Sequence, residues 1–129
     1  MNGLESKSVI KRSIDNFGRG KNAAKKFLRT ENFFEAVQDI EGLNQRRHKD
    51  GRPDWFAAWA FYSYLFKQAR SHQVSWVLSL YESYPPNCHK IYTYFLMELK
   101  VRMLNKYNMY RDSKSTYQEM ALIKIQESR

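Results

Sequence analysis

The sequence has few of the residues that make tight turns or covalent cross-links. Its 129 residues include 5 glycines, 3 prolines and 1 cysteine, Cys88. A β-sandwich or β-barrel needs many tight turns, so this scarcity favours a few long elements instead. One thiol cannot form an internal disulfide, which is typical of a protein from a reducing compartment. We therefore expect a cytoplasmic protein, or a nuclear one in a eukaryotic cell.

Long apolar runs are also missing. The longest uncharged stretch near the centre, residues 55–66, is shorter than the roughly 20 apolar residues that a membrane-spanning helix needs. The opening residues MNGLESKSVIKRS lack the apolar core of a signal peptide, and Asn2 stands where myristoylation requires glycine. These observations predict no integral membrane association.

The length and composition suit one globular domain. Hydrophobic residues make up 43% of the chain and charged residues 27%, close to the globular average. A chain of 129 residues can bury a core without help from a disulfide or a metal. We predict a single helical domain over residues 1–129, with a basic N-terminal arm at about residues 1–30.

Apolar residues recur at helical spacing along most of the chain. Gly18 and Gly20 are expected to end the first helix, so that residues 18–22 form a turn, and Thr30 is expected to interrupt the second. The fold class is therefore all-α, a compact bundle of about five or six helices. The expected helices cover residues 6–16, 22–43, 55–70, 73–83 and 88–110, with a last one after Ser115 or Thr116.

Positive charge is what the sequence has in excess. Lysine and arginine number 22 against 13 acidic residues, which gives a formal net charge of +9. Such an excess is typical of proteins that bind nucleic acid, an anionic membrane surface or an acidic protein. Eight basic and two acidic residues lie in residues 1–30. The basic ones are Lys7, Lys11, Arg12, Arg19, Lys21, Lys25, Lys26 and Arg29.

These residues have the spacing of a shared cationic face. The series 21, 25 and 29 recurs once per helical turn, as does the pair 7 and 11. We predict a small accessory or regulatory protein that binds the DNA or RNA backbone through phosphate contacts. The prediction depends on these side chains gathering on one surface without being neutralised by the acidic segment that follows. The polar loop over residues 44–54 adds Arg46, Arg47, Lys49 and Arg52 as a second patch.

Backbone or shape recognition is expected rather than base reading. Leu28 occupies the turn position where a helix-turn-helix usually has glycine, and the segment that would be its recognition helix, residues 31–41, is acidic. Tyr107 and Tyr110 lie beside basic residues and are candidates for stacking on unpaired bases. The alternative for both tyrosines is packing in the core.

No pattern indicates catalysis, a cofactor or a metal. Cys88 and His89 are neighbours at a helix start, where adjacent side chains point in different directions and do not form a nucleophile–base pair. His48 and His72 complete no zinc-ligand spacing. The glycines of residues 18–22 lack the spacing of a phosphate-binding loop. We predict a protein that is not an enzyme, with no cofactor and no metal.

A second hypothesis is a protein–protein adaptor or inhibitor. Aromatic residues make up 16% of the chain, and tryptophan and tyrosine dominate binding hot spots. A homodimer is one form of this hypothesis, because a small chain has limited room to bury so many large rings. Peripheral attachment to an anionic membrane is a third possibility, weakened by the few large apolar residues of the first helix.

Overall fold

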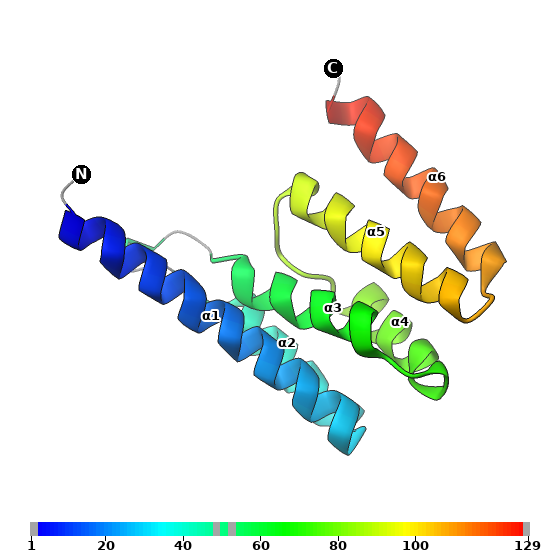
Figure 1. Ribbon diagram of the computed structural model, residues 1–129, viewed down its shortest axis with the longest axis horizontal. Helices are drawn as coiled ribbons and strands as arrows, with labels where there is room; N and C mark the ends of the chain where they lie inside the picture. Colours follow the sequence, from blue (N-terminus) through cyan, green and yellow to red (C-terminus); the bar gives the residue numbers. More distant parts are fainter. Residues whose placement is uncertain (1–2, 48–49, 52–53, 128–129) are drawn as a thin grey trace.

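The computed structural model describes residues 3–47, 50–51 and 54–127, with side chains within these ranges from residue 15 to residue 125. This part of the chain contains six α-helices and one short 3-10 helix but no strand, which confirms the all-α prediction of five or six helices (Figure 1). The helices are α1 (Gly3–Thr30), α2 (Phe33–Asn44), α3 (Phe56–Gln68), α4 (Val74–Ser83), α5 (Lys90–Lys106) and α6 (Tyr110–Glu127), with the 3-10 helix η1 (Ser71–Gln73) preceding α4.

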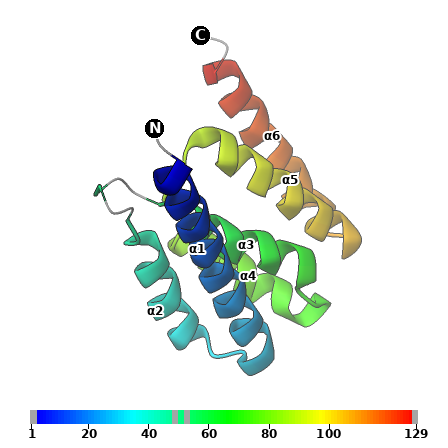
Figure 2. The same cartoon turned by 60° about the vertical axis from the view of Figure 1, so that its left-hand side comes forward.

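Helix α3 lies at the centre of the bundle. It packs against α1, α2, α4 and α5, whereas α6 packs mainly against α5. Figure 2 shows α2 on one outer side of α1, with α5 and α6 on the other. The chain therefore surrounds one buried helix and leaves α2 and α6 at opposite edges.

The central position of α3 follows from its lack of charge. Its first charged residue is Lys67, in the last turn, and eight of its 13 residues are buried. The phenol of Tyr62 is completely buried and donates to the carbonyl oxygens of Leu80, at 3.1 Å, and of Tyr84 at the end of α4. Burial raises the pKa of Tyr62, so the hydroxyl stays protonated and acts as a donor that ties α3 to α4.

The turn predicted at residues 18–22 is wrong, because α1 continues through both glycines. Gly20 is buried against α3, and a Cβ added there would overlap the carbonyl oxygen of Ala57 and lie 2.9 Å from its carbonyl carbon. The same Cβ would lie 3.1 Å from the Cβ of Ala60. Gly20 therefore allows two helix backbones to approach closely and does not end a helix. Gly18 meets nothing within 4 Å and has no such role.

Other boundaries differ from the predictions by a few residues. The interruption near Thr30 is confirmed, although the cap of α2 is Asn32, whose side chain accepts from the backbone N–H of Glu35 at 3.0 Å. Helix α5 ends at Lys106, and Asn108, with φ of 62°, turns the chain into α6 at Tyr110.

The predicted start of the last helix after Ser115 or Thr116 is wrong, because α6 begins at Tyr110. Thr116 is buried inside α6, and its hydroxyl donates to the carbonyl oxygen of Asp112 at 2.9 Å, one turn earlier. A threonine that bonds back into the preceding turn has the same sequence signature as a threonine at a helix start. The sequence pattern therefore did not reveal that residues 110–115 are already helical.

Gly18 and Gly20 predict opposite effects of alanine. Gly20→Ala places a methyl group against the backbone of α3, and we expect the free energy of unfolding to fall by about 1–3 kcal/mol. Gly18→Ala, the matched control, improves helix propensity in open space and is expected to raise it by about 0.5–1 kcal/mol. Urea denaturation followed by circular dichroism measures both. Equal effects of the two substitutions would contradict the close approach of α1 and α3.

Candidate nucleic-acid interface

The twelve basic residues predicted as phosphate contacts occupy very different environments. Five of them have side chains outside the described residues. Lys7, Lys11 and Arg12 belong to α1 but precede the described side chains, and Lys49 and Arg52 lie outside the described chain. The seven described residues are Arg19, Lys21, Lys25, Lys26, Arg29, Arg46 and Arg47.

Lys26 is neutralised by the acidic helix that follows α1. Its ammonium nitrogen lies 2.9 Å from Oε1 of Glu35 and 2.8 Å from Oδ2 of Asp39, both on α2. Hydrogen bonds to Asp39 and then to Glu35 raise the pKa of Lys26, which stays charged but is already paired. Lys26 therefore joins α1 to α2 and offers little to a phosphate.

Arg46 is part of a polar cluster between α1 and the start of α3. Its Nε donates to Oδ1 of Asn16 at 2.8 Å, and Nδ2 of Asn16 donates to Oδ2 of Asp54. Asn16 and Asp54 are buried, and the other carboxylate oxygen of Asp54 accepts from the backbone N–H of Phe56 at 3.0 Å. This cluster positions the first turn of α3, so Arg46 has a structural role.

The side chain of Arg47 forms a hydrogen bond within its own loop. It is exposed, and its Nη1 donates to the carbonyl oxygen of Gly51 at 3.3 Å. The second basic patch predicted for residues 44–54 is therefore represented, among the described residues, by Arg47 alone, because Arg46 is engaged by Asn16.

Lys21, Lys25 and Arg29 form the cationic face that the sequence predicted. All three are exposed and lie on successive turns of α1, and none of the ion pairs among the described residues involves them. Arg19 is also exposed, but it lines a different cleft, shared with Lys26 and Asp39 on the α2 side. The structure thus brings three of the twelve residues together and separates them from the acidic helix.

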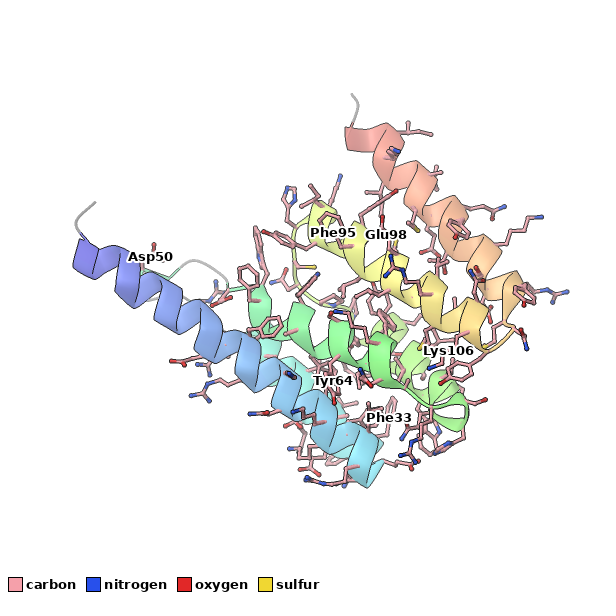
Figure 3. All side chains as sticks on the ribbon, in the orientation of Figure 1. Phe33, Asp50, Tyr64, Phe95, Glu98 and Lys106 are labelled. Carbon is pink, nitrogen blue, oxygen red and sulfur yellow. The ribbon has the colours of Figure 1, made fainter. Side chains whose placement is uncertain are left out.

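Two further residues, one on α3 and one just before η1, extend this face, and sequence reasoning missed both. Tyr64 lies between α1 and α3 (Figure 3), with the Lys25 ammonium nitrogen 6.0 Å from its ring centroid. Arg70, which follows α3, lines an open cleft of about 500 Å³ together with Arg29 and Tyr64. One sequence feature could have indicated the position of Arg70: residues 55–70 are uncharged at first and become basic at their end.

The cleft is held in place by backbone and side-chain contacts. The buried side chain of Gln73 donates to the carbonyl oxygen of Leu28 at 2.9 Å and accepts from the backbone N–H of Arg70 at 3.0 Å. Glu31 is the acidic residue of the cleft and lies 3.3 Å from Nε2 of His72. We call Lys21, Lys25, Arg29 and Arg70 the α1–α3 cationic surface.

The two tyrosines predicted as stacking candidates differ in role. Tyr107 is half-buried, and its hydroxyl donates to the carbonyl oxygen of Ala69 at 2.6 Å, which joins the end of α5 to the end of α3. The packing alternative therefore describes Tyr107. Tyr110 is 62% exposed, and its hydroxyl donates to the side chain of Asn108 at 2.8 Å.

Cys88 has the properties of a packed thiol. It is half-buried, and its sulfur lies 3.3 Å from the hydroxyl oxygen of Thr93. Burial raises the pKa of Cys88, which lowers the fraction of reactive thiolate at neutral pH. His89 is exposed and caps α5 by accepting from the backbone N–H of Ile91 at 3.3 Å.

The contrast between Arg46 and Arg47 gives a test of their roles. Arg46→Met removes a donor from the buried Asn16, and we expect the free energy of unfolding to fall by about 1–3 kcal/mol. Arg47→Met, its exposed neighbour, is the matched control and is expected to change it by less than about 0.5 kcal/mol. Thermal and urea unfolding measure both variants. A destabilised Arg47→Met with an unaffected Arg46→Met would refute the polar cluster.

Comparison with known proteins does not assign the chain to a family. The sequence matches no protein-family model, and no curated protein or solved structure shows significant similarity to it. Within the part of the chain that the structure describes, no helix is both long enough and apolar enough to cross a membrane.

Proposed function

We propose that the protein binds nucleic acid through phosphate contacts made by the α1–α3 cationic surface. The observation that supports this most is the row of exposed cations on the outer side of α1, Lys21, Lys25 and Arg29, joined by Arg70 across the cleft. The acidic residues of α2 engage Lys26 and leave this row without a carboxylate partner among the described residues.

The geometry of α1 fits a contact along a phosphate backbone. From residue 21 to residue 29 the helix rises roughly 12 Å, and its three cations lie on one side over that length. Consecutive phosphates of one DNA strand are about 3.4 Å apart along the duplex axis, so the row can neutralise several phosphates of one strand. Lysine and arginine supply charge and hydrogen-bond donors without reading the base sequence.

Recognition is therefore expected to be of the backbone, and α2 is not a reading helix. Its exposed or half-exposed side chains include Glu35, Asp39 and Glu41, which would repel phosphates at a groove. The role that follows is an accessory or regulatory one, in which the protein associates with nucleic acid largely irrespective of sequence.

Removing the row should reduce both affinity and its dependence on salt. For the variant Lys21→Gln/Lys25→Gln/Arg29→Gln we expect weaker binding to a fluorescein-labelled 20-mer, measured by anisotropy from 50 to 200 mM salt. The slope of log K against log salt should become shallower by about 2 to 3, since each lost contact removes about 0.7 for a single strand and about 0.9 for duplex DNA.

The matched control removes the same charge elsewhere. Arg102→Gln/Lys114→Gln/Lys124→Gln also takes three exposed cations from the protein, on α5 and α6, and leaves the row intact. It is expected to keep the original slope, because none of its three residues belongs to the proposed contact surface. Binding that is insensitive to salt, or equal loss in the two variants, would rule out the α1–α3 cationic surface as the binding site.

A second candidate function is self-association, favoured by one observation on α6. This helix packs mainly against α5 and leaves Leu122 61% exposed and Ile125 51% exposed, three residues apart and therefore on one side of the helix. Large apolar side chains on an outer helix are typical of a protein–protein interface. The same function class includes an adaptor or inhibitor whose partner covers this side of α6.

Sedimentation equilibrium tests the homodimer directly. If α6 forms the interface, Leu122→Glu should weaken self-association at least tenfold, because it buries a charge in an apolar contact. Phe34→Glu, at an exposed phenylalanine of α2, is the control and should leave the dimer constant unchanged. A monomer at every concentration up to 100-fold above that used for binding would exclude this candidate.

A further inference from the structure

The aromatic rings at the N-terminal end of α3 form one continuous cluster. The ring of Trp59 lies 6.4 Å from that of Phe17 on α1 and 6.4 Å from that of Tyr92 on α5, measured between centroids. Tyr92 also contacts Phe56 at 5.9 Å and Trp55 at 6.0 Å. The cluster thus joins three helices that pack side by side (Figures 1 and 2).

The inner rings of the cluster are half-buried, and two outer rings face solvent. Trp55, Trp59 and Tyr92 are half-buried, and the indole N–H of Trp59 donates to the carbonyl oxygen of Tyr92 at 3.2 Å. Phe17 is 40% exposed and Phe56 is 38% exposed. Each outer ring lies against an inner ring, and both present apolar surface to the outside.

The exposed ring of Phe17 continues directly into the α1–α3 cationic surface. Phe17, Lys21 and Lys25 lie four residues apart on successive turns of α1, and each is exposed. An aromatic ring followed by cations along one line is the arrangement that binds a nucleic-acid strand whose bases are unpaired, since the base stacks on the ring while the phosphates meet the cations. Duplex bases are already stacked on one another and cannot use such a ring without being unpaired.

We infer that the protein prefers single-stranded nucleic acid, with bases stacking on Phe17 and Phe56 and the following phosphates contacting Lys21 and Lys25. This inference rests on the proposed function and adds the substrate class to it. It also replaces the sequence-based stacking candidate Tyr107, whose hydroxyl is engaged by Ala69 and whose ring is half-buried.

The first test compares strands of equal length. Anisotropy is measured for a 20-nucleotide oligothymidine, its RNA equivalent oligouridine, and a 20-base-pair duplex at one salt concentration. The wild-type protein should bind the single strands more tightly than the duplex. Phe17→Ala and Phe56→Ala should each weaken single-strand binding roughly fivefold to 150-fold, and duplex binding less than about twofold.

The chain offers a matched control for the loss of an exposed phenylalanine. Phe34 is 73% exposed on α2, which carries the acidic residues, and Phe34→Ala should leave binding of all three probes unchanged. Phe17→Trp, which keeps an aromatic ring at the position, should retain single-strand binding. Circular dichroism establishes that each variant is folded.

A second measurement needs no change in the cluster. Trp76 on α4 is replaced in Trp76→Phe, which leaves Trp55 and Trp59, both within the cluster, as the only tryptophans. Addition of oligothymidine should then quench tryptophan fluorescence, with the same midpoint as the anisotropy change. Binding seen by anisotropy without any quenching would overturn the inference even if the alanine variants failed to fold.

The outcomes separate the inference from the proposed function. Equal losses on single strand and duplex in Phe17→Ala, or an equal loss in Phe34→Ala, would overturn stacking and leave phosphate binding in place. Single-strand binding that depends on Phe17 but not on Lys21, Lys25 and Arg29 would support stacking and refute the cationic surface. Binding to none of the probes in dilute buffer would end both.

Discussion

The close contact between α1 and α3 is the constraint on which the rest of the structure depends. Gly20 brings the backbone of α1 against the carbonyl group of Ala57, so that the two helices run side by side with small residues between them. Ala24 and Phe27 follow on the same face of α1 and are buried in the core. With this side of α1 fixed, the opposite side, which carries lysines and arginine, must face solvent.

The same contact explains why the charge of the chain is divided rather than spread. Helix α2 folds back along α1, and its carboxylates pair with Lys26 on the adjoining side. The outer side keeps Lys21, Lys25 and Arg29 away from those carboxylates, and the end of α3 adds Arg70. A net positive charge of +9 would only keep the molecule soluble if it were evenly mixed with acids. The gathering of exposed cations on the α1–α3 cationic surface, beside an aromatic cluster, is what supports the proposal of a polyanion partner.

The aromatic side chains have two different structural roles. Tyr62 and Tyr107 are held by hydrogen bonds to carbonyl oxygens and join helices within the bundle. Phe17 and Phe56 instead cover half-buried rings and leave part of their own surface outside. The rings around Tyr62 thus hold the bundle together, whereas the cluster around Trp59 leaves aromatic surface open to solvent.

The sequence by itself determined that the chain is helical, which residues repeat at helical spacing and where the uncharged central segment lies, because periodicity and charge are local properties. It also determined that Lys21, Lys25 and Arg29 share a helix side. Only the tertiary structure decided that Gly20 is a packing residue and that Arg46 is engaged by Asn16. The partners that decide these roles come from segments at least 30 residues away in the chain, and no spacing within one helix encodes them.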